Sequence, residues 1–315
     1  MKIVLTDING QEKIIRKFKK LVLKEEEGVP AHTLLVRFDP EGEPLSEIAF
    51  MRFEDEGKIV FDGIVDTITE FYSEGNYYFE VFGRNRVSLL LDNEVMPAVY
   101  SNPTSEQIKE IFLKPYGFSD YVGGTSSYNG IFNVAKGKSP WDIIESFCKT
   151  CYETVPYCSP DNVIYFTGLP SGEKITFGKG FDIDFSEYRF DIQRHKIISS
   201  VKIKRSEAED YSTEIFSQEA DKRLIQRQRY LNASNTQFTP VFCAEKMLLN
   251  GINNSRNISL KCSGLISDCL GAEASVSVFG RVIDNLKIYG LQINISENQI
   301  NTVVELRGNS SYVDT

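Results

Sequence analysis

The sequence predicts a mainly β protein with an α+β insertion, in which two similar antiparallel β-barrel-like domains are separated by a small α/β module. Three observations lead to this prediction. The chain of 315 residues has 21 Phe and 15 Tyr against one Trp, and aromatic side chains fit the pleated, half-buried surface of a sheet. Short apolar runs between Gly, Pro and polar residues fill both ends of the chain. Helical patterns gather in the middle.

Residues 1–99 are expected to form the first β-barrel domain. In the third of its strand-like runs, Ile64, Ile68 and Phe71 mix with polar residues, as in a sheet with one face in solvent. Polar, Gly and Pro residues separate the runs. The four predicted strands are His32–Asp39, Ser46–Asp55, Lys58–Tyr72 and Tyr77–Arg84.

Residues 100–170 are expected to form the small α/β module. Its first helix has Thr104 as N-cap and Gln107 three residues later, which is the spacing of a capping box. The helix should stop before Pro115, because proline cannot continue it. The residues predicted to share its buried face are Ile108, Ile111 and Phe112.

A second helix of the module is predicted to begin at Ser139. This N-cap is followed by Pro140, whose missing N–H costs nothing at the first helical position, and by Asp142 near the positive end of the helix dipole. A hairpin with its turn at Ser159–Asn162 should follow. The residues spaced to share one apolar face of the helix are Trp141, Ile144, Cys148 and Cys151.

Residues 171–205 together with 255–315 are expected to form the second β-barrel domain, and 206–254 a helical and polar insert. The insert should contain a helix from about Thr239–Pro240. The expected apolar residues of that helix are Phe242, Cys243 and Met247, and the expected later strands are Arg256–Gly264 and Ala274–Val282.

Two segments of the chain look alike. Asp62–Asn85 and Tyr289–Asn309 each begin at or next to a glycine, cross a polar turn and end on Glu-x-x-Gly. The glycines are 20 residues apart in the first segment and 18 in the second, which predicts a shorter hairpin tip in the second. Any two glycine-bounded hairpins can be aligned in this way, so a duplication and a chance likeness both remain open. The position of each copy at the end of a β-rich unit favours duplication.

The charge of the chain argues against general nucleic-acid binding. A formal net charge of −9 offers few clustered cations for phosphates, although an acidic wall that DNA passes without sticking is compatible with it. The basic run Lys17–Lys20 is offset by Glu25, Glu26 and Glu27, and a solvated charged surface is expected there. No apolar run reaches the ~20 residues of a membrane span, and the start lacks a signal-peptide pattern. We therefore expect no membrane insertion, and assembly in a cytoplasm.

The six cysteines and two histidines do not predict a metal, cofactor or catalytic site. The pair Cys148 and Cys151 has a zinc-like spacing, but no second ligand pair follows. A cysteine nucleophile with His32 or His195 as its base lacks flanking signatures. Buried free thiols are expected. A carboxylate pair of a cell-wall hydrolase or an aromatic carbohydrate-binding surface remains the alternative function.

Several short motifs resemble the baseplate hub proteins of contractile tails, that is, the phage Mu-type hub and late control protein D group and their relatives in tailocins. The order of a β unit, an α/β module and a second, interrupted β unit is similar along nearly the whole chain. The matching motifs are Phe61-Asp62-Gly63-Ile64, Phe82-Gly83-Arg84-Asn85-Arg86, Leu89-Leu90-Leu91-Asp92, the helix start Trp141-Asp142 with Ile144, and Arg227–Leu231.

The resemblance implies a structural protein and not an enzyme. It would form a homotrimer whose six β-barrel domains make a pseudo-sixfold ring between a hexameric tail tube and a trimeric spike. Other baseplate components would be further partners, and DNA a passing cargo of the channel. The location implied is a phage tail or tailocin particle assembled in the bacterial cytoplasm.

Overall fold

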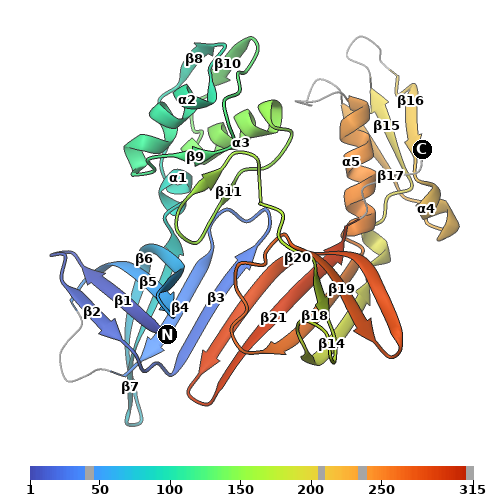
Figure 1. Cartoon of the computed structure of the whole chain (residues 1–315). Coiled ribbons are helices and arrows are strands. Elements are labelled where there is room, and N and C mark those ends of the chain that lie inside the picture. Colours follow the sequence, from blue (N-terminus) through green and yellow to red (C-terminus); the bar gives the residue numbers. More distant parts are fainter. Residues whose placement is uncertain (40–45, 205–209, 233–239, 310–315) are drawn as a thin grey trace. The chain divides into compact units, whose positions relative to one another are not determined.

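The computed structural model describes residues 1–39, 46–204, 210–232 and 240–309 (Figure 1). The chain divides into two compact units. Unit 1 comprises residues 1–170, 264–270 and 290–302, and unit 2 comprises residues 171–263, 271–289 and 303–315. The predicted mainly β class with an α+β insertion is confirmed, since large antiparallel sheets dominate both units.

The sheet of unit 1 encloses one apolar core. Its strands lie in the order β20-β3-β4-β7-β6-β5-β1-β2. Every one of these strands buries side chains in the same cluster, which is what a strongly curved, barrel-like sheet does. The strands are β1 (Lys2–Asp7), β2 (Glu12–Ile15), β3 (Lys20–Glu26), β4 (Thr33–Phe38), β5 (Ile48–Asp55), β6 (Lys58–Ser73) and β7 (Asn76–Asn85), with the end of β20 (Arg281–Ser296) beside β3.

Regular alternation of side chains explains these strands. In β4 every second residue is buried, with Leu34, Val36 and Phe38 facing the core. The four strands predicted in this region are present within two residues of the expected bounds.

The α/β module of unit 1 has its own core. Three aromatic residues, Phe132, Phe147 and Phe166, pack with neighbouring apolar side chains between short sheets and helices. Its elements are α1 (Ser88–Asp92), β8 (Ala98–Ser101), α2 (Ser105–Ile108), η1 (Lys109–Leu113), η2 (Lys114–Tyr116), β9 (Tyr121–Val122), β10 (Ile131–Val134), α3 (Pro140–Cys151), β11 (Tyr157–Cys158) and β12 (Ile164–Tyr165).

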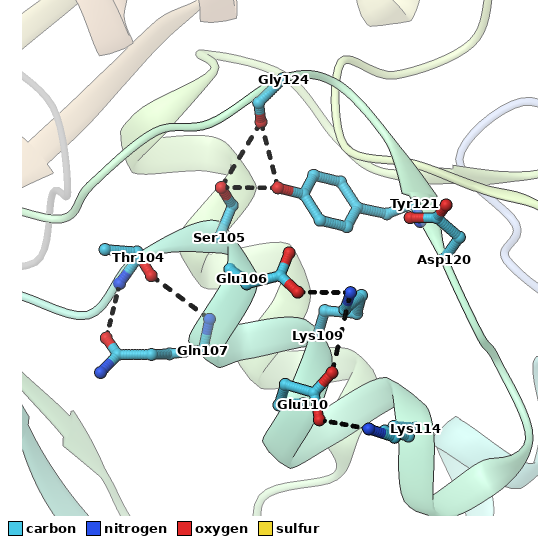
Figure 2. Close-up of polar contacts among 10 residues, drawn as sticks. All are labelled: Thr104, Ser105, Glu106, Gln107, Lys109, Glu110, Lys114, Asp120, Tyr121 and Gly124. Carbon is cyan, nitrogen blue, oxygen red and sulfur yellow. Dashed lines mark hydrogen bonds and ion pairs between the residues drawn. The ribbon is translucent and has the colours of Figure 1, made fainter.

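The start of the first helix matches the predicted capping box. Thr104 accepts a hydrogen bond from the backbone N–H of Gln107, and the Gln107 side chain accepts one from the backbone N–H of Thr104 (Figure 2). The hydroxyl of Tyr121 lies 2.9 Å from that of Ser105, and both lie within hydrogen-bonding distance of the Gly124 carbonyl. These contacts tie α2 to the loop that follows β9.

The end of this helix differs from the prediction. The π-helical turn η1 shifts the side chains, so Ile111 is exposed while Ile108 and Phe112 are buried. The chain then passes through Pro115 in a 3-10 turn instead of stopping before it. A 3-10 turn tolerates this proline near its beginning, because the first N–H groups of a helical turn need no partner within it.

The second helix, α3, begins as predicted. Ser139 and Asp142 form a reciprocal capping box around Pro140. Three of the four residues predicted for the apolar face are buried, and Cys151 at the last turn is half-buried. The hairpin β11–β12 follows, and Asn162 adopts a positive φ of 63° in its turn.

The described residues of unit 2 form two sets of strands and two helices longer than a single turn. Its elements are β13 (Ile175–Phe177), β14 (Phe185–Ile192), η3 (Arg194–Lys196), β15 (Ser200–Lys204), β16 (Thr213–Phe216), α4 (Gln218–Lys222), β17 (Gln228–Asn232), α5 (Pro240–Asn253), β18 (Arg256–Ser263), β19 (Glu273–Val278), the first part of β20 and the end of β21 (Gln299–Gly308).

Two details of unit 2 correct the predictions. The run Ala274–Val282 is two strands and not one, since Phe279 and Gly280 form a turn with φ of 50° and 74°. The buried side of α5 centres on Ala244 and Leu248, and the predicted apolar residues Phe242, Cys243 and Met247 are only half-buried at its margins.

A separate small sheet lies in unit 2. β15 pairs antiparallel with β16 and parallel with β17. α5 covers this sheet, with Val201 and Ile203 packing against Ala244 and Leu248. The predicted domain boundaries, which divide the chain into residues 1–99, 100–170, 171–205 with 255–315, and 206–254, stay a prediction.

The two look-alike segments are long hairpins of equal size. β6–β7 and β20–β21 each join a strand of 16 residues to one of 10 residues. Both tips are two residues long, Glu74-Gly75 and Glu297-Asn298, so the prediction of a shorter second tip is wrong. Counted from the tips, Ser73 corresponds to Ser296 and Asn85 to Gly308, an offset of 223 residues throughout.

Candidate assembly surface

The two β regions share one strand order. The first is β3-β4-β7-β6-β5-β1, and the second is β14-β18-β21-β20-β19-β13. Taken along the chain, the strands of the two series correspond one to one, with β2 added in the first region and β15–β17 with α4 and α5 inserted in the second. One pairing differs, because β1 is antiparallel to β5 while β13 is parallel to β19.

Burial supports this correspondence. The burial patterns of β7 and β21 agree at each of their first nine positions. Arg84 and Arg307 occupy the same place, one residue before the end of each strand. The patterns of β6 and β20 differ in their second halves: β20 buries Leu291, Ile293 and Ile295, whereas the matching part of β6 is mostly exposed.

The reason for that difference is a neighbouring strand. The second half of β20 pairs antiparallel with β3, from Gly290 opposite Glu26 to Ser296 opposite Lys20. β6 pairs with β5 only as far as Ile64, yet continues along β7 to Ser73. In the part of the chain that the structure describes, the edge of β6 from residue 65 to 73 therefore lacks a partner strand on the side away from β7.

This edge of β6 carries aromatic residues. Tyr72 is 74% exposed, and Phe71 stacks on Tyr78 with ring centroids 4.8 Å apart. The guanidinium of Arg37 lies 4.3 Å from the centre of the Tyr78 ring and also bonds Glu80 at 2.7 Å. Exposed aromatic side chains along an open strand edge are a recognised mark of a contact with another chain.

A cavity of about 650 Å³ lies between the two hairpin tips. Arg37 and Lys20 line its middle, Phe71 and Tyr78 one side, and Asn294 the other. The two look-alike tips thus face one hollow in unit 1. The sequence alone gave no sign of it, because β3 and β4, which lie between the hairpins, are far from β20 along the chain.

β14 is the strand that corresponds to β3. It pairs with β18 on one side and ends the strand order of its region. Ile192 on β14 is 57% exposed. The hydroxyl of Tyr188 is buried and has no hydrogen-bond partner among the described residues, which is costly unless a further group meets it.

No family model matches the chain, and no curated protein sequence matches it. Solved structures do. The 43 kDa tail protein of prophage MuSo2 from Shewanella oneidensis superposes with a TM-score of 0.78 over 98% of this chain and 99% of that chain, at 15% identity. The fold is that of prophage tail proteins.

Two further tail proteins share this fold along their whole length. The tail protein of Neisseria meningitidis MC58 gives a TM-score of 0.74 at 13% identity, covering 99% of this chain and 98% of that one. The prophage tail protein gp18 of Listeria monocytogenes EGD-e gives 0.63 at 14% identity, covering 99% and 96%. The resemblance inferred from the motifs therefore extends to the fold of the entire chain.

The tail-fold motif Phe82–Arg86 has a structural role. Arg84 of β7 bonds Asp66 of β6 at 2.7 Å and Asp92 of α1 at 2.6 Å. Arg86 bonds Asp62 at 2.8 Å. The motif thus holds the hairpin together and fixes the start of the module.

The cysteines and histidines considered as a nucleophile and its base lie on different elements. Burial raises the pKa of the Cys148 thiol far above its ordinary value and raises that of Cys151, which opposes formation of a thiolate. His32 packs against Glu25 and Tyr157, and His195 lies in η3. Across the described ranges, no group of three or more His, Cys, Asp and Glu residues is placed to hold a metal ion. Within the same ranges, none of the helices has the length and apolar character of a membrane span.

Proposed function

We propose that this protein is a structural baseplate hub of a contractile tail or tailocin. Three copies form a ring of six β domains that joins the sixfold tail tube to the threefold spike, with other baseplate components around it and DNA as a passing cargo. The role is mechanical and needs no catalytic side chains. The predicted division into residues 1–99, 100–170, 171–205 with 255–315, and 206–254 belongs to this proposal.

One observation carries the proposal. Inside the chain, β20 of the second β region pairs with β3 of the first, while the corresponding strands β6 and β14 each keep an open edge. Pairing β6 of one copy with β14 of the next repeats the internal contact between chains. Such a head-to-tail contact uses two different surfaces, and it closes into a ring of three when each copy is rotated by a third of a turn from the last. With two β domains in each copy, three copies give six nearly equal domains.

The register of this contact follows from the internal pairings. In the second region, the N–H of Gly264 donates to the carbonyl of Ile300, which places Lys261 opposite Val303. Val303 occupies the position of Glu80 in the first region. Lys261 on β18 therefore corresponds to the β4 residue that lies opposite Glu80 of β7.

The residue opposite Glu80 is Arg37, and Arg37 in turn lies opposite Lys20 of β3. Lys261 lies opposite Glu187 of β14, so Lys20 corresponds to Glu187. Since Ser296 pairs with Lys20 inside the chain, Ser73 is expected opposite Glu187 of the neighbouring copy.

Two further pairs follow from this register. Tyr72 meets Tyr188, and Ile68 meets Ile192. Both pairs bring apolar surface out of water, and a tyrosine ring stacked on another ring adds about 1 kcal/mol beyond that burial. At these two positions, apolar side chains of the β6 edge thus lie opposite apolar side chains of the β14 edge.

A cross-linking experiment tests the ring. The double variant Tyr72→Cys/Tyr188→Cys, treated with a short bis-maleimide, should give covalent dimers and trimers on denaturing gels. Either single variant should give neither, which controls for the six natural cysteines. Mass photometry of the wild type should show a trimer. A protein that stays monomeric at micromolar concentration, also with tube and spike proteins added, would contradict the proposal.

A further inference from the structure

A row of buried polar side chains crosses the neighbouring strands β3, β4 and β7 of unit 1 at one end of their sheet. Glu25 on β3, His32 just before β4 and Asn85 at the end of β7 are 5%, 3% and 1% exposed. The backbone N–H of Asn85 donates to the carbonyl of His32, so these two residues lie opposite each other. Alternation places all three side chains on the core face of the sheet.

The side-chain amide of Asn85 has no hydrogen-bond partner in the part of the chain that the structure describes. Its Oδ1 and Nδ2 atoms are both buried and unpaired, although an amide can donate two hydrogen bonds and accept two. The 3.7 Å between His32 Nδ1 and Glu25 Oε1 is also too long for a hydrogen bond. Buried polar groups are almost always paired with protein or ordered water, because an unpaired group loses its hydration without replacement. The row therefore needs a further group.

The chemistry of the row favours a small neutral group. Burial raises the pKa of the Glu25 carboxyl and lowers the pKa of the His32 imidazole, so each is neutral near pH 7 and offers both a donor and an acceptor. The nearby charge of Asp268 repels an anion. A metal ion is not favoured, since no three His, Cys, Asp or Glu residues of the described ranges converge here. Water is small, neutral, and able to donate and accept.

We propose that this row binds ordered water inside the first β region, with a water molecule bonded to both the Asn85 amide and the His32 imidazole. Residues opposite each other on neighbouring strands have Cβ atoms about 5 Å apart, a span that one water can bridge between two polar side chains. Tyr157 of β11 packs against the same imidazole, with ring centroids 5.9 Å apart, so the water lies where the sheet meets the α/β module. The second β region lacks the site, because Gly308 occupies the position of Asn85. The inference does not depend on the proposed ring.

A crystal structure of the wild-type protein tests the site directly. At a resolution that shows ordered water, we expect a water molecule about 3 Å from an amide atom of Asn85 and from a ring nitrogen of His32. A direct hydrogen bond between the two side chains, an amide with no density beside it, or the anomalous signal of a metal ion there would each overturn the proposal.

A measurement in solution gives an independent check. Oxygen-17 magnetic relaxation dispersion counts the long-lived internal water molecules of a protein. Asn85→Leu replaces the amide with an apolar side chain of similar size and should lower this count. The matched control is Asn133→Leu, which changes an exposed amide on β10 of the same unit and should leave the count unchanged. An unchanged count in folded Asn85→Leu would overturn the proposal, and the wild-type crystal structure decides it if that variant does not fold.

Discussion

Glu25 and His32 form a buried pair at the base of β3 and β4. The two side chains are 5% and 3% exposed, and His32 Nδ1 lies 3.7 Å from Glu25 Oε1. Burial, with the nearby charge of Asp268, raises the pKa of Glu25 to about 8, and burial lowers the pKa of His32 to about 4. Both groups are therefore neutral near pH 7. The expectation that Glu25 belongs to a solvated charged surface is wrong, because alternation along β3 turns it toward the interior.

The pair predicts how stability depends on pH. Between 6.5 and 8, the folded state keeps a proton on Glu25 that the unfolded state releases, so the free energy of unfolding falls as pH rises. Between 4.5 and 6.5, His32 acts in the opposite direction, because the unfolded state takes up a proton that the folded state refuses. A plateau near pH 4.5 to 6.5 and a decline of about 2 kcal/mol towards pH 8 are expected.

Glu25→Gln should abolish that decline, as measured by urea unfolding at pH 6.5 and pH 8 at one fixed protein concentration. The exposed neighbour gives the matched control, since Glu26→Gln should retain the decline. A wild-type protein equally stable at both pH values would show that Glu25 is ionised in the folded state.

At the scale of the element, the glycines of the first hairpin allow β6 and β7 to approach closely. A Cβ atom on Gly83 would lie 2.3 Å from the carbonyl oxygen of Ile64, and one on Gly63 would lie 2.2 Å from that of Arg84. Because the obstacle is backbone, side-chain rotation cannot relieve it. In the second hairpin, a Cβ atom on Gly308 would have its nearest neighbour at 3.2 Å, the Cα atom of Asn253.

Gly83→Ala should therefore destabilise the protein by about 3 kcal/mol, the upper range for overpacking, and Gly63→Ala by a similar amount. Gly308→Ala is the matched control and should cost clearly less. Thermal unfolding of the three variants checks this order. Equal losses in all three would mean that the short distances to backbone carbonyls at Gly83 and Gly63 add no cost beyond that at Gly308.

At the scale of the whole molecule, the proposed contact uses two different edges. Tyr72→Lys blocks only the β6 edge and Ile192→Lys only the β14 edge, and both residues are exposed, so each variant should fold and remain monomeric. An equimolar mixture retains one intact pair of edges and should stop at a heterodimer. Light scattering of the mixture measures this. A mixture that forms trimers, or variants that are trimeric alone, would exclude a head-to-tail contact through these edges.

Local chemistry in the sequence determined the strands β4 to β7 of the first β region, both helix caps of the module and the presence of two related hairpins, because alternation, capping and turn residues act within a few positions along the chain. Only the tertiary structure decided which strand edges stay open, that Glu25 is buried, and that the hairpins match at a fixed offset of 223 residues. Which edges stay open, and which side of β3 is covered, depend on pairings such as β20 with β3, which join residues more than 260 positions apart.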